Sequence, residues 1–159
     1  MRRLIWSVMA ASALMVGCGG GKDAGQTPAP PAAGAGGELS AFEVEHGIGP
    51  IKEAVVLGAL DQALVGQGKT VFEGKCTACH KMAEKYVGPA LGEVTTRRSP
   101  TFIMNMILNP QEMVERHPVG KQLLAEHMTF MANQGITVEE ARAIVEYLRT
   151  QATGTVKTQ

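Results

Sequence analysis

The pentapeptide Cys76-Thr77-Ala78-Cys79-His80 constrains this chain more than any other stretch of its sequence. On a helical turn, positions i, i+3 and i+4 share a face, so the two thiols and the imidazole can address one flat ligand. The C-x-x-C-H pattern marks covalent attachment of a c-type haem, with thioether bonds to both sulfurs and the imidazole as proximal iron ligand. The pattern predicts one covalent haem c, attached to Cys76 and Cys79 and ligated by His80.

Two other kinds of site use a Cys-x-x-Cys pair. A structural zinc site needs four ligands, and the sequence has neither a second Cys-x-x-Cys nor a paired His spacing. A thioredoxin-like redox pair follows a strand in a βαβ unit, whereas the pattern around this pair is helical. The thiol redox reading stays open as an alternative, and haem attachment is the interpretation we adopt.

Length and charge limit the classes of protein that remain. The chain has 159 residues, enough for one domain with tails, and 15 Lys and Arg balance 15 Asp and Glu. No run of basic residues indicates a nucleic-acid partner. With only four Phe and two Tyr, the chain is poor in large core residues, and a buried haem would supply apolar surface.

The N-terminus is typical of an export signal of the bacterial lipoprotein type. Residues 1–17 combine Arg2 and Arg3 with an apolar run too short to span a bilayer, and they end in a lipobox-like sequence before Cys18. Acylation of Cys18 would leave none of the three cysteines unexplained. The alternative is an ordinary signal peptide cleaved elsewhere, with Cys18 a free thiol.

The segments that follow are predicted to separate a membrane anchor from a folded domain. Residues 18–40, rich in Gly, Ala and Pro, predict a flexible linker spanning on the order of 25 Å, anchored through lipid on Cys18. Residues 41–58 are more apolar and predict an extended N-terminal arm, in which His46 is a surface or arm histidine. We expect a location on the periplasmic side, anchored to the outer or the cytoplasmic membrane.

Residues 59–154 predict a helical domain, followed by a tail at 155–159. Asp61 is a plausible N-cap for a helix running to Lys75, and Thr137 with Glu140 forms a capping box before a terminal amphipathic helix of about 14 residues. Between them, Ser99-Pro100 and Asn109-Pro110 each predict a helix start, and a further short helix is expected over 119–126.

Several spaced motifs together resemble class I monohaem cytochrome c. Gly68 and Phe72 precede the C-x-x-C-H motif, Gly88-Pro89-Ala90-Leu91 follows it, and a Met-containing loop leads into a terminal helix that includes Val145-Glu146-Tyr147-Leu148. The resemblance covers roughly residues 59 to 152. It implies an all-α fold of three to five short helices around one haem.

The resemblance also implies specific contacts. Gly68 and Phe72 would pack against the terminal helix near Tyr147, and the carbonyl oxygen of Pro89 would accept a hydrogen bond from the ring of His80. Such a bond fixes the orientation of the imidazole and raises its basicity.

The second axial ligand is expected from the loop before the terminal helix. The resemblance favours Met131, with Met128 as second choice, and His127 is a less favoured alternative. Met82 lies too near His80 to reach the opposite face, and the methionines of helical segments are expected to fill the core, namely Met104, Met106 and Met113. One of Arg97 and Arg98 could pair with a haem propionate, and the alternative is that both are solvated.

Coordination by His and Met leaves no open site on the iron, so the sequence predicts a one-electron carrier rather than an enzyme. The alternative is a haem-based sensor or binder of a small gas, with a displaceable Met. Residues 45–50, 109–113 and 131–134 resemble monohaem cytochromes that accompany nitrous oxide reductase. The resemblance implies a monomer that takes electrons from a quinol-oxidising complex or cytochrome and delivers them to a terminal reductase or oxidase.

Overall fold

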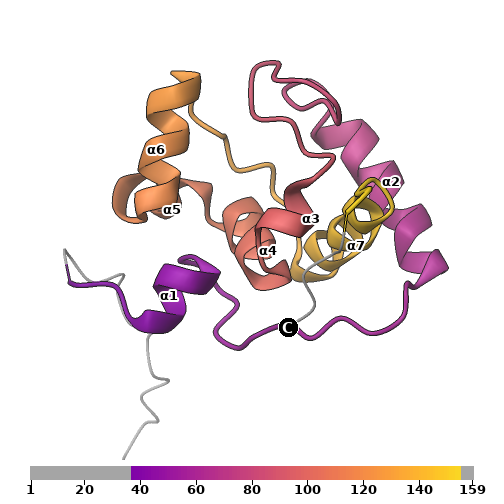
Figure 1. The fold of residues 1–159 in the computed structure, drawn as a ribbon, viewed down its shortest axis with the longest axis horizontal. Helices are drawn as coiled ribbons and strands as arrows, with labels where there is room; N and C mark the ends of the chain where they lie inside the picture. The colour runs from indigo at the N-terminus through magenta and orange to yellow at the C-terminus, as the bar shows by residue number, and fades with distance from the viewer. Residues whose placement is uncertain (1–36, 155–159) are drawn as a thin grey trace, which may run out of the picture. The chain divides into compact units, whose positions relative to one another are not determined.

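The computed structural model describes residues 37–154, which form helices and connecting loops without a β-strand (Figure 1). The all-α class is therefore confirmed, with two helices more than the largest number expected. The helices are α1 (Ala41–His46), α2 (Gln62–Lys75), α3 (Val94–Arg97), α4 (Pro100–Leu108), α5 (Pro110–Arg116), α6 (Pro118–His127) and α7 (Val138–Arg149).

The crossing of α2 and α7 is the main helix contact of the domain (Figure 1). A Cβ atom built on Gly68 would lie 2.0 Å from the carbonyl oxygen of Ala143, so only glycine lets the two backbones approach this closely. One turn further along α2, the rings of Phe72 and Tyr147 lie 5.5 Å apart. Both predicted contacts between the first and the terminal helix are present.

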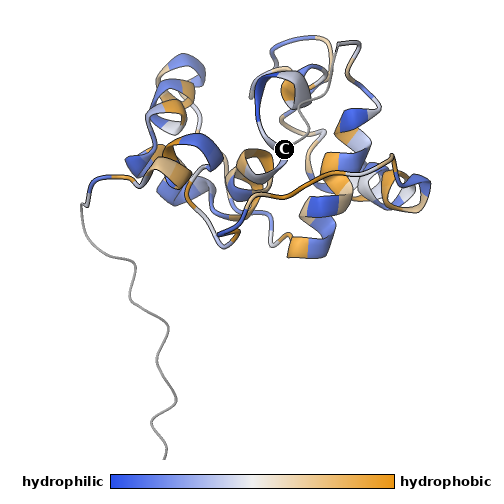
Figure 2. Cartoon of the chain, turned by 60° about the horizontal axis from the view of Figure 1, so that its bottom comes forward, coloured by the Kyte–Doolittle hydropathy of each residue, from blue (hydrophilic) through white to orange (hydrophobic). Residues whose placement is uncertain are grey.

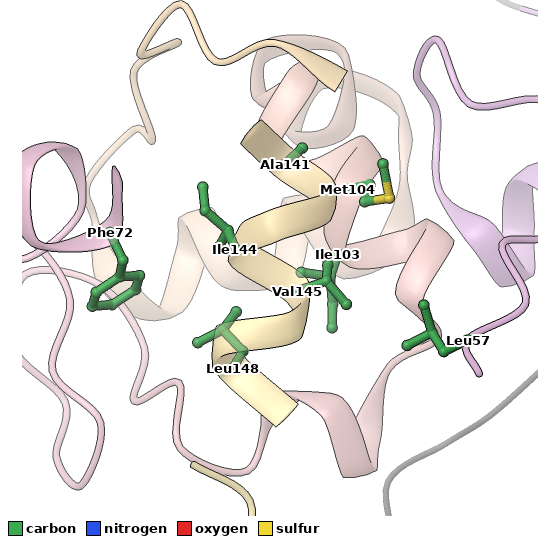
Figure 3. Close-up of a cluster of buried hydrophobic side chains, with 8 residues drawn as sticks. All are labelled: Leu57, Phe72, Ile103, Met104, Ala141, Ile144, Val145 and Leu148. Atoms are coloured by element: carbon green, nitrogen blue, oxygen red, sulfur yellow. The ribbon is translucent and has the colours of Figure 1, made fainter. Parts of the chain in front are cut away.

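The core lies between these two helices and α4 (Figure 3). Ala141, Ile144, Val145 and Leu148 recur at helical spacing and place one face of α7 in the core, where each is at most 2 % exposed. Colouring by hydropathy shows that the helices carry both hydrophobic and hydrophilic residues (Figure 2). The remaining core side chains come from the other elements: Leu57, Phe72, Ile103 and Met104.

The predicted helix starts are mostly correct. Asp61, Ser99 and Thr137 each cap a helix through the side chain, and Glu140 completes the capping box of α7. Asn109-Pro110 also opens a helix as predicted, although Asn109 makes no side-chain cap bond at the N-cap of α5. Its amide instead donates to Ile48 O and to Glu112.

The N-terminal arm differs from its prediction in two ways. Residues 41–46 form the helix α1, because Ser40 and Glu43 make a capping box that the sequence reading overlooked. His46 was expected to be a surface or arm histidine, and it lies in the arm, but it is only 6 % exposed and its Nδ1 lies 3.0 Å from the hydroxyl of Ser99. A Ser hydroxyl and the packed ring of Phe42 make this burial acceptable for a polar side chain.

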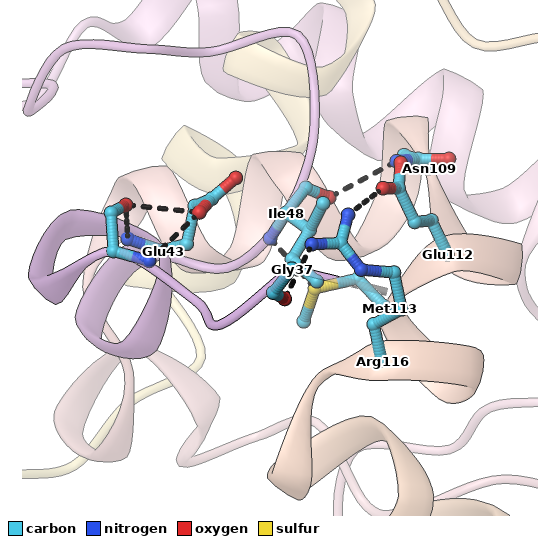
Figure 4. A network of polar contacts seen from close by, with 8 residues as sticks. Gly37, Glu43, Ile48, Asn109, Glu112, Met113 and Arg116 are labelled. Carbon is cyan, nitrogen blue, oxygen red and sulfur yellow. Dashed lines mark hydrogen bonds and ion pairs between the residues drawn. The ribbon is translucent and has the colours of Figure 1, made fainter. Parts of the chain in front are cut away.

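Asn105, on α4, holds the arm onto the domain. Its amide nitrogen donates to the carbonyls of His46 and Ile51 at 3.1 Å each, and its Oδ1 accepts from the Ile51 amide at 3.0 Å. Nearby, the amide of Ile48 contacts the sulfur of Met113, and Arg116 of α5 pairs with Glu112 and reaches the Gly37 carbonyl (Figure 4). The arm is thus part of the folded domain.

The predicted signal peptide, Cys18 and most of the linker fall outside the described residues, as does the tail 155–159. Within residues 37–154, no helix combines the length and hydropathy needed to cross a bilayer.

Candidate haem site

The Cys-x-x-Cys-His segment continues directly from α2. Cys76 is the C-cap of the helix, and the amides of Cys79 and His80 both donate to the Cys76 carbonyl, at 3.0 and 2.9 Å. This extra turn brings the two sulfurs and the imidazole to the wall of one cavity. The thiols form no disulfide with each other. Burial raises the pKa of the Cys76 thiol, whereas Cys79 is exposed.

His80 is held by the loop that follows it. Its Nδ1 lies 3.0 Å from the carbonyl oxygen of Pro89, as predicted, so Nδ1 carries the proton and Nε2 keeps a free lone pair. A Cβ on Gly88 would lie 2.5 Å from Cε1 of the ring, which explains the glycine before Pro89. Burial lowers the pKa of His80, the bond to Pro89 opposes this, and the charge of His127 lowers it further. A neutral, oriented imidazole is the form that binds a metal ion.

The cavity has a volume of about 300 Å³, and it is lined by residues of helices α2 to α7 and of the loops after His80 and His127. Most of its lining is apolar. Besides the two thiols, its ionisable lining groups are basic, and no Asp or Glu is among the described lining residues. The basic groups are Lys75, His80, Arg97, Arg98 and His127. The cavity therefore suits a large apolar ligand that carries negative charge.

The loop methionines are placed differently. Met131 is half-buried and lines the cavity with His80. Met128 is 85 % exposed, does not line the cavity, and adopts a left-handed conformation (φ 50°) as C-cap of α6. Among the described methionines, Met106 also lines the cavity, although the sequence reading treated it only as core filling. Of the two candidates from the loop, the geometry favours Met131.

Arg97, Arg98 and His127 also line the cavity. The Arg97 guanidinium donates to the Ala90 carbonyl at 3.2 Å, and that of Arg98 lies 5.0 Å from the ring centre of Phe102. The side chain of His127 is 4 % exposed. Helical spacing from α6 predicts its burial, but only the fold shows that it shares a cavity with His80.

These residues fit the predicted haem. Two unpaired thiols stand beside an oriented imidazole, a thioether sulfur lies on the wall of the same cavity, and the rest of the wall is mainly hydrocarbon. His and Met side chains are the axial donors of low-spin, electron-transferring haem iron.

Comparison with known proteins agrees with this interpretation. The family model described as cytochrome c matches residues 65–152. The structure is similar to that of a cytochrome c from Rhodothermus marinus, with 46% identity, a TM-score of 0.66, and coverage of 70% of this chain and 97% of the other. An engineered form of that cytochrome, bound to a carbene intermediate, is 47% identical with a TM-score of 0.62, covering 69% of this chain and 95% of the other.

A curated relative is a cytochrome c-553-like protein of Synechocystis. It is 32% identical over 62 residues, which cover 31% of this chain. The match spans 59% of the length of that protein.

Proposed function

Because the chain belongs to the cytochrome c family, a family of electron carriers with covalently bound haem c, we propose that it is a one-electron carrier whose iron is ligated by His80 and Met131. The observation that carries this proposal is that both side chains line one apolar cavity beside Cys76 and Cys79. When bound there, the haem supplies a reversible one-electron couple.

Each residue has a defined part in this proposal. Cys76 and Cys79 fix the haem through thioethers, and the Pro89 carbonyl keeps the His80 ring in one orientation by the 3.0 Å bond. The Met131 sulfur would be the second protein ligand of the iron and would raise its reduction potential. The apolar side chains of α4 and α7 exclude water from the cavity. If the protein supplies both iron ligands in this way, oxidation and reduction would need little rearrangement.

An optical redox titration of the haem-loaded protein, with carbon monoxide added to the reduced form, tests the proposal. We expect one one-electron wave and no carbon monoxide shift in the parent. Met131→Ala should bind carbon monoxide and lower the potential, whereas the matched Met128→Ala should behave as the parent does. An immediate shift in the parent would instead support the gas-sensor alternative and rule out a closed carrier site.

We further propose that the protein is exported and held to a membrane by lipid on Cys18, with residues 19–40 as linker. The lipobox-like sequence before Cys18 supports this placement on the periplasmic side. Cys18→Ser should move the haem protein from the membrane fraction to the soluble periplasmic fraction. Retention of the variant in the membrane would contradict anchoring through this residue.

As acceptor we propose a terminal reductase such as nitrous oxide reductase, with a terminal oxidase as the competing candidate. The support is the resemblance over 45–50, 109–113 and 131–134. The reduced protein should be reoxidised faster by purified nitrous oxide reductase than by an oxidase preparation, as followed by the haem absorbance. The reverse order of rates would contradict the proposal.

A further inference from the structure

His127 is a buried imidazole that lacks a hydrogen-bond partner. Its side chain is 4 % exposed, and neither ring nitrogen is hydrogen-bonded to any of residues 37–154. The nearest acidic oxygen, on the exposed side chain of Glu126, lies 3.7 Å from Nε2, which is too long for a hydrogen bond. A buried polar group without a hydrogen-bond partner is unfavourable. A bound ligand would supply the partner that the His127 ring lacks.

The position of His127 points to the cavity rather than to solvent. The residue lines the cavity that contains His80 and Met131. It ends α6, and the preceding residue, Glu126, accepts a hydrogen bond of 3.0 Å from Lys85, which lies in the loop between His80 and Pro89. His127 therefore lies where α6 contacts the loop that follows His80, at the edge of the cavity.

The chemistry of haem allows one kind of hydrogen-bond partner for His127 at the edge of the cavity. A bound haem offers a protein two kinds of polar atom, the iron and the carboxylate oxygens of its two propionates. His80 and Met131 are the proposed ligands of the iron. Arg97 and Arg98 line the same cavity, and no described carboxylate does, so the polar part of the lining is suited to an anion.

We propose that His127 donates a hydrogen bond from its ring to a haem propionate. The inference rests on the haem site proposed above and assigns a further binding residue to it. A hydrogen-bond donor on a propionate weakens the negative potential that the carboxylate exerts at the iron, and this stabilises the reduced state. His127 thus sets the potential of the haem and orders the end of α6 at the same time.

The reduction potential of haem-loaded variants tests the inference. His127→Leu removes the donor and should shift the ratio of reduced to oxidised haem several-fold toward the oxidised form at a fixed electrode potential. His127→Gln keeps an N–H at similar reach and should stay near the parent. His117→Leu is the matched control: His117 is also buried, but both its nitrogens are hydrogen-bonded and it does not line the cavity. It should lower the melting temperature without moving the potential.

Vibrational spectra of the propionate groups supply a readout independent of stability. They should change in His127→Leu and not in His117→Leu. Unchanged spectra and potential in His127→Leu would overturn the proposal. It would also be overturned if His127→Leu, with Met131 intact, lost the six-coordinate spectrum of the parent, because His127 would then be an iron ligand. The carbon monoxide test of the parent does not involve His127, so failure of the carrier function would be distinguishable.

Discussion

At the scale of single residues, Gly88 is where the site tolerates least change. Its α-carbon faces the imidazole so closely that an added Cβ would lie 2.5 Å from Cε1 and 2.9 Å from Nδ1 of His80. The bond to Pro89 holds one side of the ring, and a haem iron bound at Nε2 would hold the other, so the ring cannot yield freely. The packing at Gly88 therefore also fixes the orientation of the His80 ring.

We expect Gly88→Ala to destabilise the haem-loaded protein by about 1 to 3 kcal/mol, because the new methyl group must displace the His80 ring. The visible spectrum and a thermal melt measure the effect on ligation and stability. Gly58→Ala is the control, since a Cβ there meets nothing within 4 Å. Equal stability of the two variants would show that the ring relocates without loss.

Residues also show how far the sequence could predict the site. Cys76, Cys79, His80 and Pro89 form a local pattern, so their arrangement followed from spacing and resemblance. The resemblance favoured Met131 over Met128, but the surroundings of the two side chains come from the fold, in which Met131 lines the cavity and Met128 is 85 % exposed at the C-cap of α6. The environment of His127 depends on the hydrogen bond between Lys85 and Glu126 of α6, which lie 41 residues apart in the sequence. No local sequence pattern records such a contact.

At the scale of elements, the crossing of α2 and α7 depends on one small residue. We expect Gly68→Ala to cost more than about 3 kcal/mol, because its Cβ would lie 2.0 Å from a backbone carbonyl that cannot rotate away. Gly66→Ala on the same helix should instead stabilise by about 0.5 to 1 kcal/mol, since a Cβ there has open space and alanine favours the helix. Chemical denaturation measures both, and a stable Gly68→Ala would mean that the helices can separate without loss of the core.

The cap of α1 gives a pH prediction. Hydrogen bonds from the backbone and then the side chain of Ser40 lower the pKa of Glu43. A lowered folded-state pKa means stabilisation that is fully present above the ordinary Glu pKa of about 4.3 and is lost as pH falls through the folded-state value. The free energy of unfolding of the parent should therefore decline more steeply with acidification than that of Glu43→Gln. Parallel curves would show that the capping box does not contribute.

Element starts were predictable where one side chain acts locally. Ser99, Thr137 and Asp61 gave the beginnings of α4, α7 and α2 correctly. Asn109-Pro110 predicted the start of α5 as well, but the hydrogen bond from the Asn109 amide to Ile48 O in the distant arm shows the limit of such local rules. The burial of His46 was not predictable for the same reason, since its partner Ser99 lies 53 residues later.

At the scale of the whole molecule, hydrogen bonds of Asn105 join the arm to the helical domain. We expect Asn105→Ala to lower the stability by about 3 kcal/mol, because it leaves several buried backbone groups of the arm without partners. Asn133→Ala is the control, because Asn133 is exposed, and it should change stability by less than about 1 kcal/mol. Denaturation gives the free energies, and proteolysis within residues 37–60 should accelerate only in Asn105→Ala. Unchanged proteolysis there would show that other contacts hold the arm.

The bond from Arg149 to the carbonyl of Gly58 spans 91 residues at 2.9 Å. Together with the crossing of α2 and α7, this bond joins the two ends of the domain, which lie far apart in the sequence. The entropy of closing such a long loop must be overcome before these contacts form. A chain emerging N-terminus first therefore presents its thiols before the helix that completes the cavity exists.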